Sequence, residues 1–139
     1  MPGVRGFSRP DYVPGPGEID ALLSFLPVFS NPEYEPVEAV IAGWSGGSVW
    51  DAHLMRFHQA LYDNGFVYPF DWASWEERAE ELLGDPSRLA EADLQTIRML
   101  ITAHVRKERF SEGHLPEMVR CGHIAALLRR LAAIRAEMG

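Results

Sequence analysis

The later part of the sequence concentrates side chains that often bind metals. They are three histidines and the single cysteine of the chain: His104, His114, Cys121 and His123. A structural zinc site needs about four such ligands converging tetrahedrally, usually from close pairs at fixed spacings. Only Cys121 and His123 form a close pair, and His104 lies at the centre of the apolar face of its helix. We therefore predict no metal and no cofactor, and we interpret His104 as a hydrogen-bonded core histidine.

A second set could bind an anion. It lies in and before the segment RKERFSEGH, where helical spacing groups basic side chains roughly opposite the apolar face. Guanidinium groups present a planar donor fork that suits carboxylates and phosphates. The set predicts an enzyme or small-ligand binder with an anion site formed by Arg98, Arg106, Arg109, Glu112 and His114. The competing interpretation is a set of solvated salt bridges, which we favour.

The segment GWSGGS, residues 43–48, contains the letters of a nucleophile elbow. That motif requires a serine on a sharp turn between a strand and a helix of a parallel sheet. No parallel-sheet pattern surrounds it, so we expect a loop. With no nucleophile beside a base, we assign no catalytic residue and expect a protein that is not an enzyme.

The aromatic stretch FVYPFDWASWEE places Asp71 between Phe70 and Trp72. Asp71 suits the cap of the following helix, and Ser74 to Glu77 fits a capping box. A carboxylate that accepts from helix N–H groups has a lowered pKa and is a poor general base. We therefore expect Asp71, Trp72 and, before the next long helix, Asp93 to have structural roles.

The elements that must position these residues read as about six helices in an all-α domain. Apolar spacing and end signals place them near residues 17–27, 52–63, 71–84, 94–110, 111–122 and 123–138. Residues 1–16, rich in proline and glycine, predict an irregular, mobile arm before a single domain at 17–139. Residues 30–50 predict a long Gly/Pro-rich loop, with a short strand at 37–42.

Charge is distributed unevenly along the 139 residues. Residues 1–100 carry six basic and sixteen acidic side chains, whereas residues 101–139 carry seven basic and four acidic ones, and the net charge is -7. An acidic chain is repelled by nucleic-acid phosphates, so we expect little nucleic-acid binding. The exception would be a contact by the outer face of the last helix, through Arg129, Arg130 and Arg135.

Composition also bears on compartment and assembly. No apolar run is long enough to span a bilayer, and the start has no secretory h-region. A single cysteine suits a reducing compartment, so we expect a cytoplasmic protein without a membrane partner. The apolar stripe of the last helix suits either its own core or a second copy in a homo-oligomer.

Three segments together resemble the DUF6508 family, small bacterial and archaeal proteins of unknown function. They are LYDNGFVYPFDWASWEERAEELL, ADLQTIRMLITAHVRKERFSEGHL and CGHIAALLRRLAAI, and the resemblance covers residues 61–134. The resemblance implies no activity. It directs attention to the positions that match the family pattern, which are Asp71, Trp72, Asp93, Arg98, Arg109, Phe110, Glu112 and Gly113.

The uneven charge and the lack of a catalytic set favour a non-enzymatic module that binds a protein partner. An acidic surface suits a regulator that occupies the basic groove of a nucleic-acid-binding complex, for example in an anti-defence role. The anion-binding enzyme or ligand binder described above is the alternative.

Overall fold

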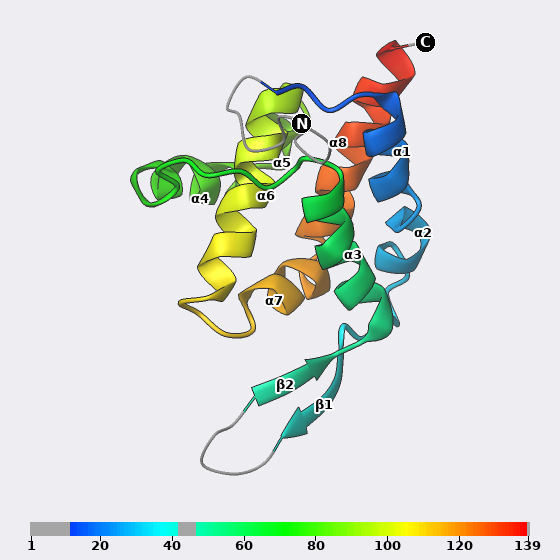
Figure 1. Cartoon of the computed structure of the whole chain (residues 1–139), viewed down its shortest axis with the longest axis vertical. Coiled ribbons are helices and arrows are strands. Elements are labelled where there is room, and N and C mark those ends of the chain that lie inside the picture. The colour runs from blue at the N-terminus through cyan, green and yellow to red at the C-terminus, as the bar shows by residue number, and fades with distance from the viewer. Residues whose placement is uncertain (1–11, 42–46, 139) are drawn as a thin grey trace, which may run out of the picture.

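The computed structural model describes residues 12–41 and 47–138, and most of them are helical (Figure 1). In chain order the elements are α1 (Pro16–Leu23), α2 (Leu26–Phe29), β1 (Val37–Ile41), β2 (Gly47–Trp50), α3 (Ala52–Asp63), the 3-10 turn η1 (Ala73–Trp75), α4 (Glu76–Gly84), α5 (Pro86–Leu89), α6 (Leu94–Glu108), α7 (His114–Arg120) and α8 (His123–Glu137). The all-α prediction is confirmed, with the addition of one small hairpin.

Helix α8 lies at the centre of the helical body and contacts α1, α2, α5, α6 and α7. Its apolar stripe faces this core: Leu127, Leu128 and Leu131 have no exposed surface. Burying a leucine contributes roughly 2 kcal/mol, so the stripe is a main source of stability. Of the two roles left open for the stripe, packing within its own core is the one observed.

The segment expected to be a loop forms an antiparallel hairpin of β1 and β2, with Val40 opposite Ser48. Figure 1 shows it extending away from the helices. The expected strand at 37–42 is thus present as β1. Its partner β2 was not predicted, because its first two residues, Gly47 and Ser48, do not favour a strand. The G-x-S-x-G letters lie mostly in residues 42–46, outside the described part of the chain.

A hydrogen-bond cluster joins the hairpin to α3. The Asp51 side chain caps α3 by accepting from the His53 N–H at 2.9 Å. Its Oδ2 also accepts from the Tyr34 hydroxyl at 2.8 Å. Burial and this bond raise the pKa of Tyr34. The base of the hairpin is therefore fixed to the helical body.

The hydrogen bonds that cap the starts of α4 and α6 differ in length. Asp93 Oδ1 accepts from the Thr96 N–H at 2.8 Å, an N-cap of ordinary length. Asp71 Oδ1 accepts from the Ser74 N–H at 3.4 Å, and the turn η1 comes before α4. The expected capping box at Ser74 is absent, because the chain enters α4 through this 3-10 turn and leaves Trp75 at the N-cap.

The predicted mobile arm, residues 1–16, falls mostly outside the described residues. The described end of the arm is held in place: the Tyr12 hydroxyl donates to Glu18 Oε1 at 2.8 Å. The Tyr12 carbonyl accepts from Arg98 Nη1 at 3.2 Å. This part of the arm is therefore packed onto the domain rather than free of it.

Candidate functional site

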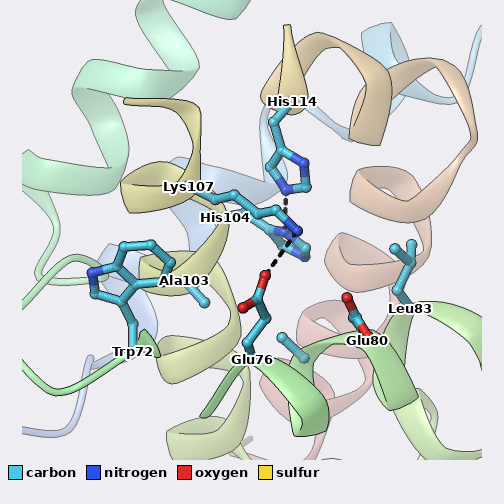
Figure 2. Close-up of a pocket in the computed structure, with 9 residues that line it drawn as sticks. Trp72, Glu76, Glu80, Leu83, Ala103, His104, Lys107 and His114 are labelled. Atoms are coloured by element: carbon cyan, nitrogen blue, oxygen red, sulfur yellow. Dashed lines mark hydrogen bonds and ion pairs between the residues drawn. The ribbon is translucent and has the colours of Figure 1, made fainter. Parts of the chain in front are cut away.

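A small pocket lies between α4 and α6 (Figure 2). We call it the α4–α6 pocket; its polar and aromatic lining is Trp72, Glu76, Glu80, His104, Lys107 and His114. The cavity volume is about 30 Å³, the space that one water molecule occupies. A pocket of this size takes a single small group, not a whole metabolite.

The acidic side of the pocket comes from α4. Glu76 and Glu80 are four residues apart, which places both carboxylates on the same face of the helix. Glu76 Oε1 lies 3.2 Å from Lys107 Nζ of α6, the ion pair drawn in Figure 2. Within the described part of the chain Glu80 forms no ion pair. The pocket therefore has two exposed carboxylates, of which Glu76 is paired with a lysine.

An aromatic rim, Trp72 and Phe110, extends the pocket wall onto the surface. The two ring centroids are 5.7 Å apart, and Phe110 is 79% exposed. Trp72 lies just before η1 and Phe110 just after α6, so the rim joins the two elements that form the pocket. A large exposed aromatic beside a partly buried one is typical of a contact surface.

Behind the pocket, three histidines form a continuous hydrogen-bonded chain, His123–His104–His114. His104 Nδ1 lies 2.9 Å from His114 Nε2, and His104 Nε2 lies 3.0 Å from His123 Nε2. Both ring nitrogens of His104 are thus used. His104 and His123 are buried and His114 is half-buried at the pocket. The expectation of a hydrogen-bonded core histidine at position 104 matches this geometry.

Two glycines set the directions from which the outer histidines enter the chain. Gly113 and Gly122 directly precede His114 and His123, and their φ angles are +90° and +85°. The left-handed region is accessible to glycine at little cost. These glycines turn the chain into α7 and α8 and so place the first residue of each helix against His104.

The pKa values of all three rings are lowered. Burial is the main cause at each ring; it holds the pKa of His104 well below its usual range and lowers that of His123 to about 4. The neighbouring histidines add to both effects. Burial and Lys107 lower the pKa of His114, while Glu108 and Glu76 oppose them. The chain is therefore neutral at pH 7.

A second cavity, of about 270 Å³, is lined by Leu83, His123 and Cys121. Leu83 lines the α4–α6 pocket as well. The histidine chain thus runs between two cavities, with His114 at one and His123 at the other.

The residues considered for a metal site come together only in part. The three histidines meet in pairs through different nitrogens of His104, a geometry for hydrogen bonds rather than for one shared ion. The Cys121 thiol donates to the Met118 carbonyl, with Sγ 3.6 Å from the oxygen. Across the described residues, no group of three or more His, Cys, Asp or Glu side chains is arranged to hold a metal.

The expected anion site does not assemble, because Arg98 lies in the core. Its side chain has no exposed surface, and Nε donates to the Gly65 carbonyl at 2.7 Å. The guanidinium carbon lies 3.9 Å from the centroid of the Tyr68 ring. Backbone carbonyls and the Tyr68 ring therefore contact the Arg98 guanidinium group, which was expected to face a ligand.

The other members of that set are dispersed. Arg106 is half-buried on α6, and Arg109 and Glu112 are exposed after it. Arg109 lies close enough to His58 to lower the pKa of that ring, although burial is the main cause. His114 belongs to the histidine chain instead. The turn between α6 and α7 is held by Glu108, which accepts from the Gly113 and Leu115 N–H groups at 2.9 and 2.7 Å.

The basic side chains of α8 tie the helix to its neighbours. Arg135 Nε lies 3.0 Å from Asp20 Oδ1 of α1, and Arg130 Nε donates to the Ala92 carbonyl at 2.7 Å. Arg129 Nη2 makes a longer contact with Ser30 Oγ at 3.4 Å. These partners lower the number of cations on α8 that are available to a phosphate backbone.

Sequence reasoning missed the pocket. The available signal was the spacing of Glu76 and Glu80, which shows that they share a face. Nothing in the sequence indicates that this face meets Lys107 of α6, because the contact depends on how two helices pack.

In the described part of the chain, no helix combines the length and the apolar character needed to span a bilayer. The sequence profile of DUF6508, a family of unknown function, matches residues 15–137, which is most of the chain. No curated protein and no solved structure gives a significant match.

Proposed function

We propose that this chain, which belongs to the DUF6508 family, is a non-enzymatic interaction module that binds a cationic side chain of a protein partner in the α4–α6 pocket. The observation that carries the proposal is the combination of two carboxylates and an indole around a cavity of about 30 Å³. That volume suits one ammonium group and leaves no room for a substrate of metabolite size.

The chain's own lysine supports a cationic occupant. Lys107 Nζ already lies 3.2 Å from Glu76 at this pocket, so the site accommodates an ammonium group. Glu80 supplies a second carboxylate without an ion pair in the described part of the chain. A partner lysine can therefore pair with Glu80, or replace Lys107 at Glu76.

The aromatic rim supports a protein partner rather than a free ion. The face of a tryptophan attracts a cation and contributes about 0.5–2 kcal/mol, depending on how far the site excludes water. Phe110 offers an exposed ring beside it, and aromatic side chains often dominate binding at protein interfaces. A basic segment carrying apolar groups would use the pocket and the rim together.

The overall charge supports a basic partner. Net charge is -7, and α4 carries the four acids Glu76, Glu77, Glu80 and Glu81. Complementary charge speeds association and selects among partners. The basic groove of a nucleic-acid-binding protein is one such basic partner surface. By occupying that groove, the module would inhibit nucleic-acid binding, for example in an anti-defence role.

The test is binding of tetralysine and tetraarginine peptides, measured by calorimetry at low salt, with tetraglutamate as the reverse-charge control. We expect Glu80→Gln to weaken tetralysine binding about threefold, since an exposed charge pair contributes up to about 1 kcal/mol. Lys107→Met should strengthen it, because it removes the internal competitor for Glu76.

Two further variants make the test specific to the pocket. Phe110→Ser should weaken peptide binding without affecting stability, because this ring is largely exposed. Glu33→Gln, in the connection between α2 and β1, changes net charge equally and should leave binding as it is. If Glu33→Gln and Glu80→Gln have the same effect, the peptide binds the general acidic surface and the proposal is wrong.

A further inference from the structure

The histidine chain has a limited capacity for protons. Three rings carry six nitrogens, and four of these meet in two contacts of 2.9 and 3.0 Å. Each contact holds one hydrogen, since two N–H groups facing each other at this distance repel. Only the outer nitrogens, Nδ1 of His114 and Nδ1 of His123, lie outside the contacts.

This geometry separates the first proton from the second. The neutral chain carries three hydrogens, two in the contacts and one on an outer nitrogen. A first added proton fills the other outer nitrogen and leaves both contacts intact. A second has no vacant outer position, so it must break a contact.

Charged groups on two neighbouring elements, α4 and α6, face the chain. On α4 they are the carboxylates of Glu76 and Glu80, and on α6 they are Lys107 and Glu108. Beside His123 on α8, the second cavity contains the Cys121 thiol. Glu108 is already engaged by the Gly113 and Leu115 N–H groups. A charge gained by His114 therefore acts on Lys107, Glu108 and Glu76, and two of these, Lys107 and Glu76, line the pocket.

We propose that the chain His123–His104–His114 is a proton-operated switch of the α4–α6 pocket, which binds a cationic side chain while the chain is neutral and releases it when the chain is protonated. This inference rests on the proposed function of the pocket. The proton comes from solvent, which reaches the chain through the α4–α6 pocket at His114 or the second cavity at His123.

The first proton places one positive charge on the chain, two of whose rings, His104 and His114, line the pocket, and this charge repels a bound ammonium group. The second breaks the contact between His104 and His114, because His114 is the least buried of the three rings and the free ring can reach solvent. The displaced His114 then lies beside Glu76 and Glu80 as an imidazolium that competes for them. Burial holds the pKa values of the rings below their usual range of about 6.5, so the pocket is open to a cation at pH 7 and closes only when pH falls through these lowered values.

The experiment compares tetralysine affinity at pH 7.5 and pH 5 in the full chain, His114→Gln and the control His53→Gln. Glutamine keeps one N–H donor for His104 and stays neutral throughout. We expect wild type and His53→Gln to lose about tenfold in affinity between the two pH values, and His114→Gln to lose much less. Equal losses in wild type and His114→Gln would overturn the switch.

A ligand-free measurement separates the switch from the proposed function. Ring ¹⁵N chemical shifts of wild type, followed from pH 8 to 4.5, report which nitrogens carry hydrogen. We expect the inner nitrogens to stay hydrogen-bonded through a first proton uptake, with the His114 signals changing at a second, lower step. Three rings that titrate independently near pH 6.5 overturn the switch whether or not the peptide binds. A failure of tetralysine to bind at pH 7.5 overturns the proposed function, and the switch with it. The ring ¹⁵N shifts of wild type still test the switch if His114→Gln fails to fold.

Discussion

Arg98 and His104 lie less than two turns apart on α6, and each places a polar group in the core. Both are stabilised by nearby partners: Arg98 donates to backbone carbonyls and stacks on Tyr68, and His104 bonds two other histidines. A buried polar group is costly only when it lacks such partners. At the scale of single residues, stability therefore depends on complete hydrogen bonding as much as on apolar burial.

The histidine chain predicts loss of stability in mild acid. The folded-state pKa values lie below the unfolded value of about 6.5, so the unfolded chain binds more protons as pH falls. Stability is complete above pH 6.5 and should fall between pH 6.5 and 5 by roughly 1 kcal/mol per pH unit for each ring that stays neutral. Urea unfolding at several pH values measures it. His53→Gln should show the wild-type slope, and a flat profile would contradict the prediction.

Replacing Arg98 should destabilise the protein far more than replacing Arg109. Arg98→Ala leaves the Gly65 and Tyr12 carbonyls without this donor and opens a cavity beside Tyr68, at a cost of about 3 kcal/mol or more. Arg109→Ala, at an exposed position just after the same helix, should change stability by less than about 0.5 kcal/mol. Chemical unfolding compares the two. Similar values for both variants would show that Arg98 is not part of the core.

At the scale of elements, the starts of α7 and α8 determine where the outer histidines lie. Neither helix has a side-chain cap; each begins instead with a left-handed glycine, Gly113 or Gly122. By contrast, α6 begins with the ordinary cap Asp93. The starts of α7 and α8 are thus set by a left-handed glycine, and that of α7 also by Glu108, which accepts from the Gly113 and Leu115 N–H groups.

Substituting Gly122 should therefore be costly even though space is available. A Cβ at this position meets no atom within 4 Å, so only the φ of +85° opposes it. We expect Gly122→Ala to destabilise the protein by about 1–2 kcal/mol, and Gly122→Asn by less, since asparagine tolerates this region better. Thermal unfolding measures both. A matched control is Gly17→Ala in α1, where φ is not positive and no steric contact arises.

At the scale of the whole molecule, the excess of acid lies in residues 1–100 and the excess of base in residues 101–139. The fold brings the two parts together through ion pairs such as Asp20 with Arg135, Glu35 with Arg120 and Glu76 with Lys107. These ion pairs neutralise much of the basic excess of residues 101–139 within the molecule. The molecule as a whole keeps a net charge of -7.

This balance predicts opposite responses to two polyelectrolytes. Duplex DNA should give no retarded band in a gel-shift assay even at low salt, because the net charge is -7 and Arg135 of α8 is paired with Asp20. Tetralysine should bind, with an affinity that falls as salt rises from about 50 to 500 mM, since the interaction is mainly between exposed charges. A retarded DNA band that Arg129→Ala abolishes would contradict this prediction.

The sequence by itself determined the long helices α3, α6 and α8, the Asp93 cap, the inward stripe of α8 and the uneven charge. Each of these follows from local spacing or composition, which tertiary contacts did not override. The second strand of the hairpin and the 3-10 entry to α4 did not follow, because their residues favour no single local structure.

Only the tertiary structure decided the site. Helical period assigned Arg98 to solvent, yet residues 65–68 cover that face of α6: Gly65 accepts from Arg98, and Phe66 and Tyr68 bond to Thr102. The pocket joins positions 76 and 107, and the histidine chain joins 104 with 114 and 123. Spacing fixes the angle of a side chain around its own helix, but the packing of helices distant in sequence decides what lies opposite it.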